Sequence, residues 1–144
     1  MPIQLRQGEM HVIELVEFHD GEVERLVLEQ GGLVVVHFSH LSIYETRAVD
    51  LYDIVSYEAE LRATDAIELV LRGAISRGNK VAFLRVNDEE ARSLSLEETQ
   101  TMLKSGTAAE LHFDNGATLA FRCSNIELIL RRRGEVIEEW KGPL

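Results

Sequence analysis

Residues 108–123 read AAELHFDNGATLAFRC, and this stretch decides the fold. Two alternating apolar segments flank a turn sequence that contains Asn-Gly, a strong hairpin signal. A two-residue loop would leave Leu111 facing away from Leu119, whereas a three-residue loop over 114–116 pairs the two leucines on one face. Because side chains alternate along a strand, only the second register keeps the apolar face together. We therefore predict a hairpin with a type I turn and a bulge that holds Gly116 at positive φ.

The rest of the chain repeats this pattern of short apolar segments separated by turn residues. Prolines occur only near the two ends, at Pro2 and Pro143, which leaves the sheet residues uninterrupted. We predict a mostly β protein, an antiparallel β-sandwich or flattened barrel of about eight to nine strands with one short helix near residues 95–105. Residues 33–36 are all apolar, so their strand is expected to be central. The predicted strands cover residues 11–18, 22–29, 33–40, 52–63, 66–73, 80–86, 108–113, 117–123 and 125–132.

Two further turns are predicted from dipeptides that contain glycine. Asp20-Gly21 indicates a type I′ hairpin between residues 11–18 and 22–29, which gathers their aliphatic side chains on one face. Arg133-Gly134 indicates a turn after which residues 135–140 return as a last short strand. That turn would bring three acids near the arginines at 131–133: Glu135, Glu138 and Glu139. Within the strand predicted at 66–73, one face is shared by Ile67, Leu69 and Leu71.

The only strong helix signal is SLEETQTMLKSG, residues 95–106. Ser95 and Glu98 form a capping box, in which the hydroxyl accepts from an unpaired amide and the carboxylate accepts from the amide of the capping residue. Gly106 stands where a glycine often ends a helix in the left-handed region. A modest apolar stripe for packing comes from Leu96, Met102 and Leu103.

Length and charge limit the possible partners. The 144 residues fit a single domain over 1–144, with short flexible tails at about 1–9 and 141–144. The chain has 15 lysines and arginines against 25 acids, a formal net charge of −10. That field repels phosphate backbones and anionic membranes, so we expect no nucleic acid and no membrane as partner. It favours encounter with a basic protein partner, and it also keeps the chain soluble.

Cysteine usage and hydropathy indicate the cytoplasm. Cys123 is the only cysteine, so no disulfide can form within the chain. It is predicted on the inward face of its strand, as a small hydrophobic residue. No apolar run approaches the ~20 residues that a membrane helix needs. The first ten residues lack the apolar core of a signal peptide, so we expect a cytoplasmic protein.

Residues 31–45, GGLVVVHFSHLSIYE, contain Gly31, His37, His40 and Glu45 in that order. This segment resembles the first motif of the cupin family, in which a glycine precedes two histidines and a glutamate that bind metal inside a β-barrel. The resemblance implies a barrel with a metal site at these side chains. The cupin pair is His-x-His, whereas two residues separate the histidines here, so the rings point to opposite faces unless a bulge intervenes. No second cupin motif follows, and we expect no metal and no cofactor.

Two acidic stretches are the candidate partner-binding regions. Residues 44–60 place tyrosines among acids, and residues 88–98 contain five acids against one arginine. A tyrosine beside an acid suits a protein interface, because the ring supplies apolar area and the hydroxyl a hydrogen bond. The same residues also fit core tyrosines and a solvated helix start. The predicted partner-binding residues are Tyr44, Glu45, Asp50, Tyr52, Asp53, Tyr57, Asp88, Glu89 and Glu90.

The sequence favours a non-enzymatic acidic binding protein, of the inhibitor or immunity type, that masks a basic surface on another protein. No catalytic residue is predicted, because no histidine has a nucleophile and an orienting group at a recognisable spacing. A homodimer is left open. The alternative is a small-ligand-binding or metal-binding, cupin-like β-barrel, in one version an enzyme. A pocket with converging polar groups would favour this alternative, and a filled core with an acidic, tyrosine-bearing face would favour the binding protein.

Overall fold

A computed structural model describes residues 12–144 as nine strands and one helix. The strands are β1 (Val12–Glu29), β2 (Leu33–Ala48), β3 (Leu51–Thr64), β4 (Ile67–Arg72), β5 (Val81–Val86), β6 (Glu89–Glu90), β7 (Ala108–Phe113), β8 (Thr118–Arg122) and β9 (Asn125–Lys141). The helix is α1 (Leu96–Lys104). The strand count and the single short helix confirm the predicted composition of the fold.

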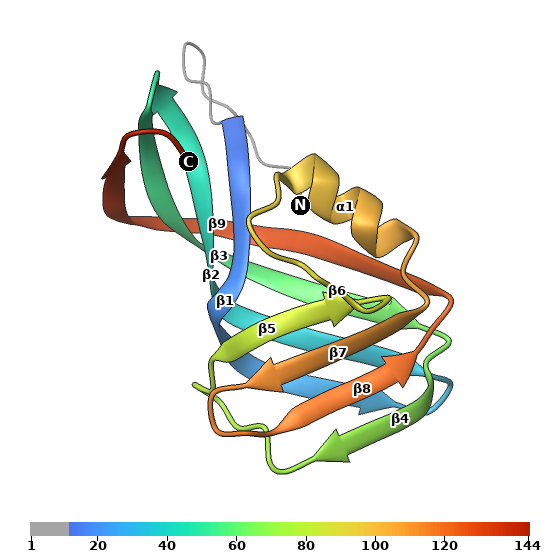
Figure 1. Ribbon diagram of the computed structural model, residues 1–144. Helices are drawn as coiled ribbons and strands as arrows, with labels where there is room; N and C mark the ends of the chain where they lie inside the picture. The colour runs from blue at the N-terminus through green and yellow to red at the C-terminus, as the bar shows by residue number, and fades with distance from the viewer. Residues whose placement is uncertain (1–11) are drawn as a thin grey trace.

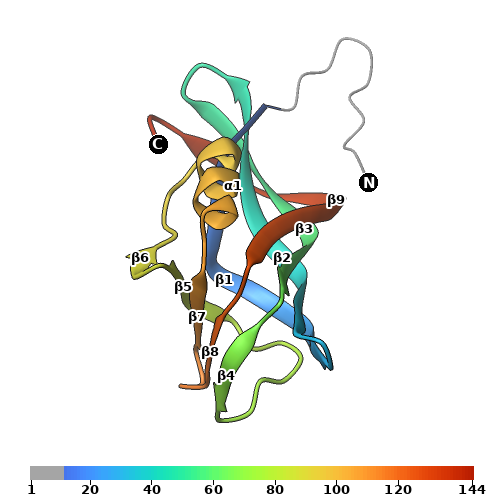
Figure 2. The same cartoon turned by 90° about the vertical axis from the view of Figure 1, so that its right-hand side faces the viewer.

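The strands form two antiparallel sheets that face each other as layers of a sandwich (Figures 1 and 2). The first sheet has the order β1-β2-β3-β9 and the second the order β4-β8-β7-β5-β6. Within the described residues the sheets do not close into a barrel. Of the two predicted architectures the sandwich is therefore correct. The helix α1 lies at one end of the sandwich, where it packs against β9 and β1 (Figure 1).

Apolar side chains from both sheets fill the space between the layers. Tyr57 and Leu41 of the first sheet and Leu119 of the second are fully buried, and they belong to one contiguous cluster. The residues at 34–36 are all buried on a strand that has neighbours on both sides, as predicted for a central strand. Cys123 is also buried in this core, and the loss of solvent raises the pKa of its thiol.

The β7–β8 hairpin has the predicted register. Leu111 lies opposite Leu119, and the amide of Gly116 donates to the carbonyl of Phe113 over 3.0 Å. Gly116 has φ 85°, in the left-handed region that a three-residue loop with a bulge requires. Packing of the leucine face thus selects the turn, as the sequence argument predicts.

The predicted hairpin at Asp20-Gly21 is wrong, because β1 continues through this dipeptide. Asp20 has φ 64° and the pairing of β1 with β2 shifts register here, so the dipeptide forms a bulge in a long strand. A Cβ on Gly21 would lie 2.6 Å from Cδ2 of Leu41, which explains the glycine. The chain reverses instead at Gly31 and Gly32, with φ 91° and 85°. Asp-Gly provides positive φ for a turn or a bulge alike, and pairing with β2 decides between them.

The predicted turn at Arg133-Gly134 is also wrong, because β9 is one strand of 17 residues. Gly134 allows a close approach of two strands, since a Cβ there would lie 2.6 Å from the backbone oxygen of Ser56. The acids at 135–139 continue along the strand and do not fold back on residues 131–133. Glu139 pairs with Arg47 of β2 instead.

Strand β4 exists as predicted, but its expected apolar face does not pack inward. All six residues are exposed, with Ile67 at 60% and Leu71 at 42%. Glu68 has φ 53°, and the register with β8 shifts beside it, so a bulge interrupts the alternation of side chains. The strand also lies at the edge of the second sheet, where one side has no neighbouring strand to pack against.

The helix begins with the predicted capping box. The amide of Glu98 donates to Oγ of Ser95 over 3.0 Å, and the amide of Ser95 donates to Oε1 of Glu98 over 3.2 Å. Gly106 follows the helix as predicted but does not have positive φ. Its role is steric, because a Cβ would lie 2.7 Å from Cγ1 of Val86. The predicted apolar stripe packs on the core through Leu96, Met102 and Leu103.

The two chain ends differ in what the structure describes. The tail predicted at 1–9 lies outside the described residues. At the other end, Lys141 belongs to β9, and the amide of Gly142 donates to the carbonyl of Asp50 over 2.7 Å. Among residues 12–144, no helix has the length and apolar character needed to span a membrane.

Candidate functional site

Three of the predicted partner-binding residues meet in one surface groove, which we call the aromatic groove. Its volume is about 510 Å³, and most of its lining residues come from β1, β2, β3 and β9 and from the start of α1 with the segment before it. Three aromatic and three carboxylate side chains line it: Tyr44, Tyr52, Trp140, Glu14, Asp50 and Glu98. The remaining described lining residues are Leu15, Ser93, Ser95, Pro143 and Leu144.

Strand register brings these residues together from distant parts of the sequence. Tyr52 on β3 lies opposite Trp140 on β9, so the two rings are cross-strand neighbours. Asp50 sits in the turn between β2 and β3 with φ 53°, and its carbonyl accepts from Gly142 near the end of the chain. The groove therefore depends on the long β3–β9 pairing that continues through Gly134.

The sequence argument missed Trp140, Glu14 and Glu98 as members of this site. Trp140 is the only tryptophan of the chain and is 44% exposed. A lone tryptophan within an acidic segment is a signal that could have identified it, because tryptophan is enriched among the hot spots of protein interfaces. Glu14 carries no such signal, since only the fold brings β1 beside the β2–β3 turn.

The groove is negatively charged. None of its described lining residues is a lysine or an arginine. Oε1 of Glu14 accepts from Oγ1 of Thr46 over 2.7 Å, and Oε1 of Glu98 accepts from its capping amide. Burial, followed by the negative charges of Glu17 and Glu138, raises the pKa of Tyr44. The hydroxyl of Tyr44 therefore stays protonated and can donate a hydrogen bond to a ligand.

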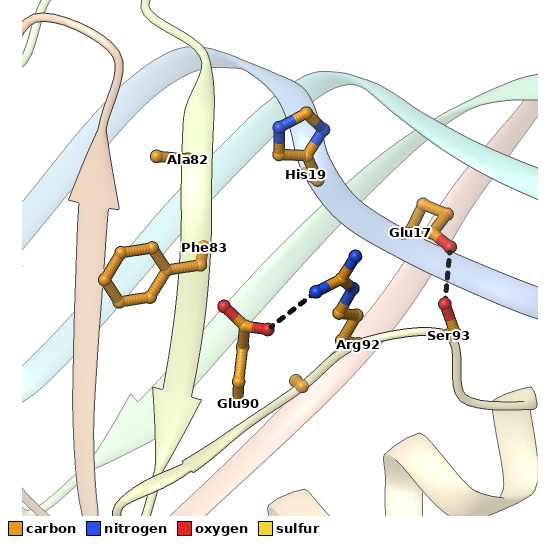
Figure 3. A pocket seen from close by; sticks show the side chains of 8 residues that line it. Glu17, His19, Ala82, Phe83, Glu90, Arg92 and Ser93 are labelled. Carbon is orange, nitrogen blue, oxygen red and sulfur yellow. Dashed lines mark hydrogen bonds and ion pairs between the residues drawn. The ribbon is translucent and has the colours of Figure 1, made fainter.

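A second pocket, of about 360 Å³, contains the predicted residue Glu90 together with a basic side chain. Figure 3 shows Arg92 lying between Glu90 and His19, with Phe83 of β5 to the left of Glu90. Nη1 of Arg92 is 3.9 Å from Oε2 of Glu90, and Oγ of Ser93 donates to the neighbouring Glu17 over 3.4 Å. This pocket carries both signs of charge, which distinguishes it from the aromatic groove.

Asp53 is engaged by a basic side chain within the protein. Nη2 of Arg47 lies 2.6 Å from Oδ1 of Asp53, and Arg47 also pairs with Glu139. The two carboxylates raise the pKa of this guanidinium, with Glu139 the larger influence. Asp53 therefore presents a compensated charge, unlike Asp50 three residues earlier.

Glu45 and Tyr57 lie inside the protein and not on a surface that a partner could contact. Their exposed fractions are 2% and 0%. Nη2 of Arg133 donates to Oε1 of Glu45 over 2.8 Å, and Nε lies 3.1 Å from both carboxylate oxygens. The hydroxyl of Tyr57 donates to the same carboxylate, and burial with this bond raises the pKa of Tyr57. These three side chains link β2, β3 and β9.

The other predicted acids, Asp88 and Glu89, are exposed at the turn between β5 and β6. Asp88 has φ 65° and does not line the aromatic groove. Glu89 lines a separate groove beside α1. The two acidic stretches of the sequence are thus divided among several surfaces and do not form one patch.

The two histidines of the cupin-like segment share one face, which corrects the expectation that they diverge. A bulge in β2 between residues 38 and 41 supplies the extra residue. Nδ1 of His37 lies 3.1 Å from Glu60 and Nδ1 of His40 lies 2.7 Å from Ser56, and these partners share a face of β3. Burial lowers the pKa of both rings. Within residues 12–144, no three His, Cys, Asp or Glu side chains are grouped to hold a metal ion.

The arrangement suits recognition of a cationic group. Aromatic faces and carboxylates line one open groove, and the described residues there include no basic side chain that would neutralise the acids. The cupin-like histidines contact Glu60 and serines on another part of the first sheet. Comparison of the chain with protein-family models, with curated proteins and with solved structures finds no match.

Proposed function

We propose that the chain is a non-enzymatic acidic binding protein and that a basic segment of a protein partner occupies the aromatic groove. The observation that carries this proposal is the lining of the groove, three aromatic and three acidic side chains with no described lysine or arginine among them. Carboxylates attract a cation, and aromatic faces favour one that is only weakly hydrated.

An arginine side chain of the partner fits this chemistry best. Its planar guanidinium stacks on aromatic rings and presents several donors to carboxylates. Tyr52 and Trp140 offer neighbouring rings, and Asp50 lies beside them. A cation over an aromatic face contributes about 0.5–2 kcal/mol, depending on how far it is desolvated. Buried aromatic anchors of this kind are frequent hot spots of protein interfaces.

The class of binding protein follows from charge. A net charge of −10 accelerates encounter with a basic surface, and an inhibitor or immunity-type protein uses such a field to mask that surface. The single cysteine is buried, which fits a reducing compartment such as the cytoplasm. The described core is filled by apolar side chains, which favours a binding surface over an enclosed ligand site.

The groove contains its own reporter, because Trp140 is the only tryptophan of the chain. We expect a short oligo-arginine peptide to change the fluorescence of Trp140 in a saturable way, and the change to weaken as salt screens the carboxylates. An oligo-glutamate peptide of the same length is the control and should produce no change. Binding of both peptides alike, or of neither, would contradict the proposal.

A matched pair of variants tests the location. Asp50 and Asp88 are both exposed and both have positive φ, 53° and 65°, which asparagine also tolerates. We expect Asp50→Asn to raise the Kd for oligo-arginine about three- to tenfold, roughly 0.6–1.4 kcal/mol, while Asp88→Asn has little effect. Equal effects of the two substitutions would show that the aromatic groove is not the site.

A further inference from the structure

A second groove runs along α1 next to the aromatic groove, and we call it the helix groove. Its volume is about 540 Å³. Glu89, Glu97 and Glu98 supply three carboxylates to its lining, and Leu94 and Met102 supply apolar surface. Both apolar side chains are only partly buried, so part of each stays available to a ligand.

The two grooves meet at the start of α1. Glu98 lines both of them. The segment before the helix is also shared, since Ser93 and Ser95 line the aromatic groove and Leu94 lines the helix groove. The junction is held in place, because the carbonyl of Leu94 accepts from the amide of Val16 over 2.8 Å and Ser95 forms the capping box.

Charge sets these two grooves apart from three other surface pockets. Neither groove has a lysine or an arginine among its described lining residues. The three other pockets contain at least one arginine each. Together the two grooves carry five carboxylates, of which Glu98 belongs to both: Glu14, Asp50, Glu98, Glu97 and Glu89. Glu97 and Glu98 lie in the first turn of α1, beside the positive end of the helix dipole.

We propose that the partner segment is extended and occupies both grooves at once. A cationic side chain enters the aromatic groove, the chain passes Glu98, and an aliphatic side chain packs in the helix groove against Leu94 and Met102. This inference rests on the proposed function, and it adds the partner's shape and its second specificity position. Methionine suits such a contact, because its flexible side chain adapts to aliphatic groups of different shape.

The test compares peptides that differ only at the second position. Each begins with the same short oligo-arginine block, followed by glycine spacers of increasing number and one terminal leucine. A parallel series carries the leucine at the other end, so that both directions of the segment are tested. The control series ends in serine. At one spacer length we expect the leucine peptide to bind about tenfold more tightly than its serine counterpart, with Trp140 fluorescence as the readout.

Two variants test whether the tighter binding of the leucine peptide arises in the helix groove. Thr101 is exposed on α1 and lines the groove, so Thr101→Arg fills it without touching the core. We expect Thr101→Arg to abolish the preference for leucine, so that the leucine and serine peptides bind this variant equally. Glu89→Gln should weaken the long peptide, whereas Glu90→Gln should not, because Glu90 lines a different pocket and pairs with Arg92.

The outcomes separate the two proposals. If oligo-arginine binds but no spacer length favours leucine over serine, the extended segment is excluded and the proposed function stands. A leucine preference that survives Thr101→Arg would likewise overturn the assignment to the helix groove. If oligo-arginine itself does not bind, the proposed function fails first. Association of the protein with itself in the absence of peptide, blocked by Thr101→Arg, would identify a second copy as the occupant and would also overturn the inference.

Discussion

Glu45 stabilises the strands that form the aromatic groove, although it does not line the groove itself. A buried carboxylate costs several kcal/mol of solvation unless its oxygens are paired and hydrogen-bonded. Arg133 and Tyr57 supply these partners from the two strands that also carry Trp140 and Tyr52. The cluster of Glu45, Tyr57 and Arg133 therefore holds β2 and β3 against β9. The aromatic groove lies near the end of the β3–β9 pairing.

Replacing Arg133 tests how far the stability of the protein depends on this cluster. We expect Arg133→Leu to destabilise the protein by about 3–5 kcal/mol, because the buried Glu45 carboxylate loses the charge and the hydrogen bonds that Arg133 supplies. Unfolding in urea, followed by circular dichroism, measures the loss. Arg132→Leu is the matched control, since Arg132 is exposed and should change stability by well under 1 kcal/mol.

A double variant checks the reason for that loss. Glu45→Leu combined with Arg133→Leu removes both charges and should be more stable than Arg133→Leu alone, because the buried carboxylate that Arg133 stabilised is removed with it. If the double variant lost the sum of the two single effects, the pair would not be coupled. The described role of the cluster would then be wrong.

At the scale of elements, the features predicted correctly are those fixed by local chemistry or by one neighbouring strand. The β7–β8 register follows from Gly116 and the leucine face, and the start of α1 follows from Ser95 and Glu98. In each case all the interacting residues lie within a few positions of one another. These two features can therefore be predicted from the sequence alone.

The wrong predictions share a cause, which is that a distant strand decided the outcome. Asp20-Gly21 provides positive φ, but β2 pairs on both sides of it and converts a possible turn into a bulge. Gly134 has no side chain, and the backbone of Ser56 on β3 occupies the space where a Cβ would lie. The candidate site follows the same rule. Tyr44, Asp50 and Tyr52 were predicted from one stretch, while Trp140 joins them only through the β3–β9 register.

Two glycines should respond differently to the same substitutions. We expect Gly134→Ala to cost about 1–3 kcal/mol, because its Cβ would lie 2.6 Å from a backbone oxygen that cannot move without parting β3 from β9. Gly116→Ala should cost about 1 kcal/mol for a different reason, since the space is open but φ is 85°. Asparagine tolerates positive φ, so Gly116→Asn should recover most of the stability, whereas Gly134→Asn should not. Equal rescue at both positions, in urea unfolding, would contradict these roles.

For the whole molecule, the distribution of charge matters more than its sum. Several acids are compensated where they lie, as Asp53 is by Arg47 and Glu90 is by Arg92. Basic residues also gather away from the aromatic groove, as in the pocket that contains Arg131. Among the residues described, the linings of the aromatic and helix grooves thus contain acids and no lysine or arginine.

This distribution predicts that equal changes of net charge have unequal effects on binding kinetics. Asp50→Asn, Asp88→Asn and Glu90→Gln each raise the net charge of −10 by one unit. Exposed charges are screened beyond a Debye length of about 8 Å at physiological salt, so only a carboxylate in the groove should steer the approach of a cation to Trp140. In stopped-flow measurements of Trp140 fluorescence, we expect Asp50→Asn to slow association with oligo-arginine several-fold and to reduce its salt dependence. The other two variants should associate at close to the original rate. If all three slowed equally, the field of the whole molecule and not of the aromatic groove would guide the partner.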